Sequence, residues 1–145
     1  KAGENENLLF LGTTGLGKTH LSLSIAKEVI NGNFGVVYAP AQKLVSDLER
    51  EHFSFSGNDS AMKKYTLCDL LIIDDLGTEF VTPFSVATLY NLINTRQNKG
   101  LSTIISTNLS ATELAGKYDG RIYSRIVGAG YTVLRFEGSD HRVLR

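Results

Sequence analysis

Short apolar runs alternate along the chain with stretches in which apolar residues recur at helical spacing. The run from Leu70 to Ile73 is continuous, as expected for a strand buried on both faces of a parallel sheet. Between the runs, positions such as Leu21, Ile25 and Val29 share one face of a helix. The pattern predicts strands at residues 8–11, 35–39, 70–73, 102–106 and 131–136.

Helices are predicted between these strands. Gly32 is expected to terminate the first helix, and Ser110 with Glu113 three residues later forms a capping-box pattern. The alternation of strands and helices predicts an α/β fold, a three-layer sandwich with a five-stranded parallel sheet. The predicted helices cover residues 18–31, 41–51, 60–65, 83–98, a short segment after Ser110, and 119–127.

A glycine-rich segment separates the first predicted strand from the first predicted helix. Residues 12–19 read GTTGLGKT and match the pattern G-x-x-x-x-G-K-[ST] in the strand–turn–helix context that the pattern requires. Glycines allow the backbone N–H groups to surround an anion, and the helix directs its positive dipole end toward the same point. We therefore expect the phosphates of a nucleoside triphosphate to bind here. The residues predicted to contact the nucleotide are Thr14, Gly15, Leu16, Gly17, Lys18, Thr19 and His20.

Two carboxylates, Asp74 and Asp75, directly follow the apolar run at 70–73. Ligands of parallel sheets gather at the carboxyl ends of the strands, so we expect Asp74 beside the glycine-rich loop. There Asp74 and the Thr19 hydroxyl would hold Mg²⁺. Asp75 would orient or deprotonate the attacking water, which separates hydrolysis from mere binding. Asp is one methylene shorter than the Glu that many such hydrolases carry, so binding without hydrolysis stays an alternative.

Asn108 lies just beyond the strand predicted at 102–106. It would hydrogen-bond the γ-phosphate or the attacking water from the neighbouring strand. The alternative is that Asn108 only caps the next turn, a position that Asn favours.

Several segments together resemble the AAA+ family of P-loop ATPases, and more closely the DnaC/DnaI-type helicase loaders and the IstB-type transposition ATPases. The first segment is common to many P-loop ATPases, whereas the combination of the others is narrower. The resemblance covers nearly the whole chain and implies an ATPase with the AAA+ fold. The segments are NLLFLGTTGLGKTHLSLSIAKEV, DLLIIDDLGTEF, STIISTNLS and GRIYSRI.

The resemblance also implies roles for polar residues outside the glycine-rich loop. Asn108 would be the sensor residue of the fourth strand. Arg125 would be an arginine finger that reaches the γ-phosphate of a neighbouring subunit, so self-assembly through Arg125 is implied. Arg121 lies four residues earlier on the same helix face, and a salt bridge to Asp119 or Glu113 is its alternative role.

Comparison with the family pattern adds two expectations about the extent of the chain. Like the loaders it resembles, the sequence shows no helical lid after the last predicted strand, which makes Arg142 a candidate substitute contact. Loaders also carry an N-terminal region that binds the replicative helicase, and nothing here corresponds to it. We therefore expect residues 1–145 to be one AAA+ core taken from a longer protein.

The segment between the second and third strands is where single-stranded DNA would bind, since the family binds it along the inner face of its assembly. Basic and aromatic side chains there suit phosphates and stacked bases. Neighbouring acidic residues dilute the charge, so a solvated helix and a packed loop are an equal alternative. The candidates are Lys43, Arg50, Phe53, Phe55, Lys63, Lys64 and Tyr65.

Composition and charge bear on the partners and the compartment expected for the chain. The 145 residues have a formal net charge of +0, so overall electrostatics predict no nucleic-acid affinity. The one cysteine, Cys68, excludes an intramolecular disulfide and fits a reducing compartment, so a cytoplasmic protein is expected. No apolar run reaches the ~18 residues of a membrane helix.

The leading prediction is therefore the ATP-hydrolysing core of a DNA-replication helicase loader, dependent on Mg²⁺ and on an arginine finger between subunits. One alternative is an IstB-type transposition helper with the same chemistry. Another is a nucleotide-gated binding module with negligible hydrolysis.

Overall fold

A parallel sheet forms the centre of the molecule. The computed structural model describes residues 6–13, 15, 17–54, 57–118, 120–128 and 130–137. Its sheet has five strands in the order β2-β3-β4-β1-β5, and every neighbouring pair is parallel. This confirms the predicted sheet. The strands are β1 (Asn7–Leu11), β2 (Val36–Pro40), β3 (Leu70–Leu76), β4 (Ser102–Thr107) and β5 (Tyr131–Arg135).

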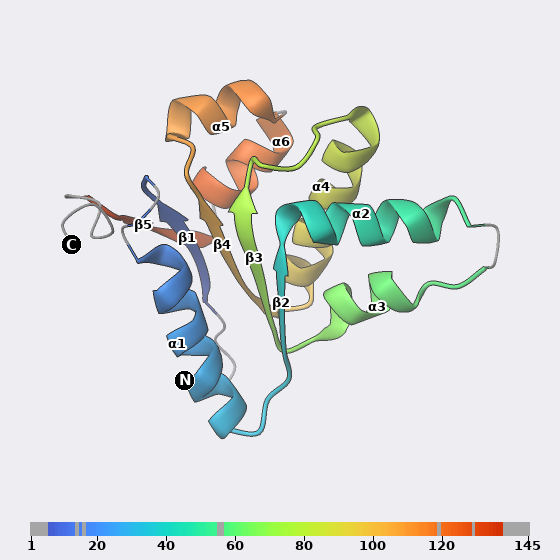
Figure 1. Ribbon diagram of the computed structural model, residues 1–145, viewed down its shortest axis with the longest axis horizontal. Coiled ribbons are helices and arrows are strands. Elements are labelled where there is room, and N and C mark those ends of the chain that lie inside the picture. The colour runs from blue at the N-terminus through green and yellow to red at the C-terminus, as the bar shows by residue number, and fades with distance from the viewer. Residues whose placement is uncertain are drawn as a thin grey trace.

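Helices cover the two faces unequally (Figure 1). One face packs against α1 through a core that includes Phe10, Ala26 and Ile72. The other face packs against α2, α4 and α6 through a larger core that includes Leu9, Leu44 and Leu92. The helices are α1 (Lys18–Asn31), α2 (Ala41–His52), α3 (Ser60–Leu67), α4 (Pro83–Asn98), α5 (Ala111–Lys117) and α6 (Gly120–Tyr123), and a π-helical turn, η1 (Ser124–Gly128), follows α6.

Local sequence signals account for several helix ends. Ser110 and Glu113 form the predicted capping box of α5, and Thr82 forms a second one with Ser85 at the start of α4. Helix α1 ends at Asn31 as predicted, but Gly32 has φ −84° and the left-handed residue is Asn33, with φ 69°. Asn adopts this conformation more readily than most residues, so it can serve in place of glycine.

Two other predicted elements are corrected. The third strand does not stop at Ile73 but runs to Leu76, with an irregularity in its pairing to β4 between Ile73 and Leu76. Asp74 and Asp75 therefore lie within the strand. The single helix predicted at 119–127 is instead α6 followed by the π-helical turn η1, and residue 119 lies outside the described residues.

A fully buried arginine joins four parts of this architecture. Arg96 of α4 is 0% exposed, yet its guanidinium is satisfied by oxygen acceptors at the end of α3, in the turn that follows it and at the start of β4. A buried cation is tolerated only when its donors are paired in this way. The acceptors are the carbonyl oxygens of Tyr65, Thr66, Cys68 and Ser102 and the hydroxyl of Thr103.

Candidate functional site

The strand order brings three polar segments to one edge of the sheet. Strand β4 lies between β1 and β3, so the loop after β1, the acidic end of β3 and Asn108 after β4 are neighbours. Lys18 joins two of these segments, because its Nζ donates to the Oδ1 atom of Asn108 at 2.8 Å. The same Nζ donates to the carbonyl oxygens of Gly12 at 2.5 Å and Thr13 at 2.9 Å.

The loop after β1 requires glycine at particular positions. Gly17 has φ 94°, in the left-handed region, and an added Cβ there would meet nothing within 4 Å. At Gly12 an added Cβ would lie 2.6 Å from the carbonyl oxygen of Phe136, which is closer than real Cβ contacts. Gly15 also has a positive φ of 90°. Thr14 and Leu16, predicted to contact the nucleotide, lie outside the described residues.

Asp74 is held by three hydroxyl groups. Its side chain is buried, and the Thr19 hydroxyl donates to its two carboxylate oxygens at 3.2 and 3.1 Å. The Ser106 hydroxyl and the Tyr38 hydroxyl donate to Oδ1 and Oδ2, respectively. Burial, and then the hydrogen bond to Asp74, raise the pKa of Tyr38, so the phenol stays a protonated donor. The structure thus places Asp74 beside Thr19, as predicted.

Tyr38 and Ser106 were not identified as site residues from the sequence. Ser106 belongs to the run of small polar residues that ends β4, and parallel pairing of β3 with β4 would have placed it near Asp74. Tyr38 gave no such signal. Its position follows only from the register of β2 against β3, in which Pro40 lies opposite Asp74.

Asp75 has an unusual backbone and an unfavourable electrostatic setting. Its φ is 55°, at the irregularity of β3, and its N–H donates to the Ser106 hydroxyl at 3.2 Å. Burial raises the pKa of the Asp75 carboxyl, the nearby Asp74 raises it further, and Lys18 opposes both. Residues with such a backbone persist only where surrounding contacts hold them in place, and they cluster at functional sites.

These residues enclose one pocket of about 280 Å³. Its cation is Lys18, whose pKa burial lowers while Asp75 and Asp74 oppose that change. Facing it are a carboxylate and an amide, an arrangement that can bind an anion and hold a polar group against it. The lining residues are Gly15, Gly17, Lys18, Thr19, His20, Asp75 and Asn108.

Comparison with known proteins agrees with this geometry. Residues 2–121 match the family described as IstB-like ATP binding protein. The chain belongs to this family. The ATP-binding protein of insertion sequence IS232 from Bacillus thuringiensis subsp. berliner is 34% identical over 107 residues, which are 74% of this chain and 42% of the relative. The matched part is thus less than half of that relative's length.

Solved structures share the fold of this IstB-like chain. Domain III of the replication initiation protein DnaA from Thermotoga maritima superposes with a TM-score of 0.83 and 26% identity, covering 97% of this chain and 58% of that one. The DnaC helicase loader superposes with a TM-score of 0.77 and 26% identity, covering 92% and 80%. The AAA+ P-loop fold is therefore confirmed.

The predicted finger arginine lies away from the pocket. Arg125 belongs to η1 and is not among the residues that line the pocket. It lies over the ring of Tyr90 together with Arg121. The alternative salt bridge from Arg121 to Glu113 has a competitor, since Glu113 accepts the Ser110 N–H in its capping box. Asp119 and Arg142 lie outside the described residues.

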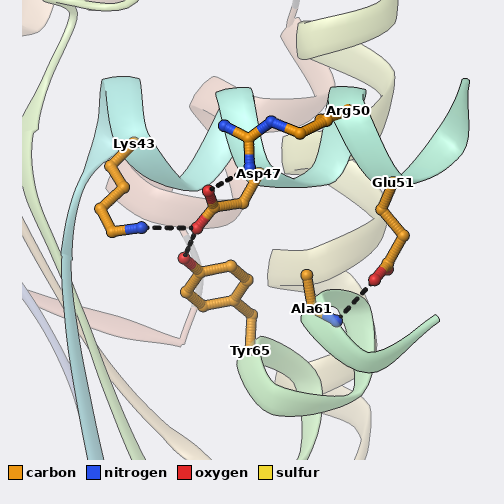
Figure 2. Close-up of polar contacts among 6 residues, drawn as sticks. All are labelled: Lys43, Asp47, Arg50, Glu51, Ala61 and Tyr65. Carbon is orange, nitrogen blue, oxygen red and sulfur yellow. Dashed lines mark hydrogen bonds and ion pairs between the residues drawn. The ribbon is translucent and has the colours of Figure 1, made fainter. Parts of the chain in front are cut away.

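The structure argues against DNA binding by several of the candidate residues between β2 and β3 (Figure 2). Tyr65 is 1% exposed and donates to Asp47 at 2.6 Å, so its prediction as a base-stacking residue is wrong. Lys43 and Arg50 both pair with Asp47, at 3.0 and 3.5 Å. Phe53 stays 58% exposed, and Phe55 lies outside the described residues.

Two further properties of the described residues concern membrane spans and metal clusters. None of the helices there is both long and apolar enough to span a membrane. No group of three or more His, Cys, Asp or Glu side chains is placed there to hold a metal.

Proposed function

We propose that this chain binds and hydrolyses ATP with Mg²⁺ at the pocket around Lys18. The observation that carries the proposal is the convergence of Lys18, Asn108, Asp75 and the Thr19–Asp74 pair at one edge of the sheet. Lys18 and the glycine-rich loop would bind the phosphates. The pocket volume suits the polar part of a nucleotide and leaves the base to adjacent surface.

The oxygen atoms of Thr19 and Asp74 fit a magnesium ion. They already lie 3.1 Å apart, and Mg²⁺ prefers oxygen ligands while using only one or two carboxylates. The ion would supply neutralisation of charge on the phosphate oxygens. Tyr38 and Ser106 would keep the Asp74 carboxylate oriented for this ligation, as outer-shell donors do.

Asp75 and Asn108 would position the attacking water. Both line the pocket, and Asn108 also holds Lys18. The raised pKa of Asp75 moves it closer to that of an effective general base near neutral pH. Asp75 would accept the proton of the water as its oxygen attacks the γ-phosphorus, and the bond to the ADP leaving oxygen breaks.

Arg125 would act on a neighbouring copy. It is partly buried on a different element and does not line the pocket of its own chain. A guanidinium from a second chain would neutralise charge in the transition state, and fingers supplied in this way raise the rate by about 10³–10⁵. Hydrolysis should therefore require assembly.

The test is ATP turnover across a series of protein concentrations. We expect specific activity to rise with concentration for the wild-type chain. Arg125→Ala should abolish that rise while leaving ATP binding intact, because Arg125 is outside the pocket. Arg125→Lys should restore little, since a point charge lacks the planar fork.

Two outcomes contradict this proposal. Turnover that is independent of concentration and insensitive to Arg125→Ala would exclude a finger in trans. ATP binding with turnover at background at every concentration would support the alternative of a nucleotide-gated binding module.

The proposed partner is a replicative helicase, bound through a region beyond this core, with single-stranded DNA as a second ligand. The likeness to the DnaC helicase loader supports it. A transposition helper is the second candidate, favoured by the insertion-sequence relative. Turnover measured with the host's helicase and, separately, with its transposase and target DNA would distinguish them, because only the true partner should change the rate.

Because ATPases of this type work inside the cell, we also propose a cytoplasmic location.

A further inference from the structure

Two arginines share one aromatic ring at the surface formed by α4 and α6. The Cζ atom of Arg121 lies 4.8 Å from the centroid of the Tyr90 ring, and that of Arg125 lies 6.0 Å from it. Tyr90 is partly buried and packs against the larger core, so the position of its ring is fixed by α4. Both distances are within the range of cation–π attraction.

The local backbone brings the two arginines together. Arg121 belongs to α6, whereas Arg125 lies in the π-helical turn that follows. Single π-helical turns are rare and are frequently found at functional sites. Two like charges brought to one place repel each other, and the negative face of a tyrosine ring offsets part of that repulsion.

Stacking on a ring and a salt bridge to a carboxylate use different parts of a guanidinium group. A guanidinium is planar, and its five N–H donors lie in that plane. A carboxylate partner would occupy those donors, whereas a ring uses only a face of the group. The stack on Tyr90 therefore restricts the Arg125 side chain without itself consuming the donors that a phosphate would need, and less rotamer entropy is lost when a phosphate binds.

We propose that Tyr90 is a positioning residue that holds Arg125, with Arg121 beside it, ready to contact the γ-phosphate bound by a second copy of this chain. The inference rests on the proposed finger role of Arg125. Tyr90 does not line the pocket and would act only through the arginines.

The test is a mixing assay of two kinds of chain. One kind, the donor, cannot hydrolyse ATP itself and can only supply its arginines to the active site of the other. The donor is the Asp75→Asn chain, expected to bind ATP without hydrolysing it, added in excess to a low concentration of wild-type chain. Stimulation of the wild type then measures the donor's finger. We expect Tyr90→Leu in the donor to reduce the stimulation about threefold to fivefold, and Tyr90→Phe to retain it, because the ring is kept. Asn91→Ala, on the same helix and exposed, is the matched control and should change nothing.

The outcomes separate the two proposals. If Arg125→Ala in the donor abolishes stimulation but Tyr90→Leu does not reduce it, the finger stands and the positioning role is overturned. If Tyr90→Leu increases stimulation, the ring restrains the finger and the proposal is again wrong. If the Arg125→Ala donor stimulates as well as the unmodified donor, the finger in trans fails, and the role of Tyr90 falls with it.

A second measurement detects the stack without any assay of turnover. The Nε–Hε signals of Arg121 and Arg125 in NMR spectra should carry the ring-current shift of Tyr90. The shift should persist in Tyr90→Phe and vanish in Tyr90→Leu, with the rest of the spectrum showing that both variants are folded. Signals that are identical in all three chains would contradict the stacking on which the proposal depends.

Discussion

Asp75 combines a left-handed backbone with a carboxylate in a place that disfavours its charge. We predict that Asp75→Asn raises the free energy of unfolding by about 1 kcal/mol at pH 7 and abolishes turnover. Asn tolerates the left-handed conformation, so the substitution removes the charge and keeps the backbone. Asp75→Ala is the control, and it should gain less because alanine pays for the positive φ. Chemical unfolding measures both.

The pH dependence follows from the direction of the pKa change. The folded-state pKa of Asp75 is raised, so the folded chain loses stability as the pH rises through that pKa. Below the ordinary Asp pKa of about 4, Asp75 is protonated in the folded and unfolded chains alike. The advantage of Asp75→Asn should vanish there. An equal or lower stability of Asp75→Asn at pH 7 would show that the charge of Asp75 does not destabilise the folded chain.

Tyr38 tests whether the hydroxyl groups around Asp74 matter to magnesium. Tyr38→Phe removes only the donor to Asp74 Oδ2 and keeps the ring. We predict that the Mg²⁺ concentration giving half-maximal turnover rises about tenfold, as is typical when an outer-shell partner is lost. Tyr123→Phe, on α6, is the matched control. Equal Mg²⁺ requirements in the two variants would exclude this role for Tyr38.

At the scale of elements, helix α3 depends on a residue of α2. Its own N-cap residue, Asp59, makes no side-chain cap. Instead, the Glu51 carboxylate accepts the N–H group of Ala61 at 2.7 Å (Figure 2). It also accepts the N–H group of Met62 at 3.0 Å. A carboxylate at a helix N-terminus satisfies orphan donors and the positive dipole end together.

We therefore predict that Glu51→Gln lowers the free energy of unfolding by about 1 kcal/mol. Glu49→Gln, an exposed change of the same kind on α2, should have almost no effect. Urea unfolding of the two variants measures the difference. Equal stability of both variants would mean that the cap contributes nothing to folding.

Element boundaries show where sequence patterns suffice. Helix α1 was predicted at its observed bounds because the glycine-rich loop and Gly32 frame a clear helical period. The extension of β3 to Leu76 was missed, because two acidic residues after an apolar run usually indicate a turn. Hydrogen bonds to neighbouring strands keep the two acidic residues in β3, and one of them is donated by the Asp75 N–H to the Ser106 hydroxyl. No local sequence pattern contains that information.

At the scale of the whole molecule, the alternation of strands and helices predicted the parallel sheet and the edge at which the site forms. The glycine-rich motif and the acidic end of the apolar run predicted that Lys18, Thr19 and Asp74 lie together. The position of Arg96 could not be predicted, since its acceptors come from α3, from the turn after α3 and from β4. Tyr38 likewise reaches Asp74 only through the packing of β2 on β3.

The most direct test of the account is the binding of ATP to the whole chain, by calorimetric titration with and without Mg²⁺. We predict binding that Mg²⁺ strengthens and that Lys18→Ala weakens about tenfold or more, because a charge-assisted contact to phosphate is lost. The melting temperature of Lys18→Ala should stay close to that of the wild type. Binding that is equally strong in Lys18→Ala, or no binding by the folded wild type, would contradict the assignment of this pocket to ATP.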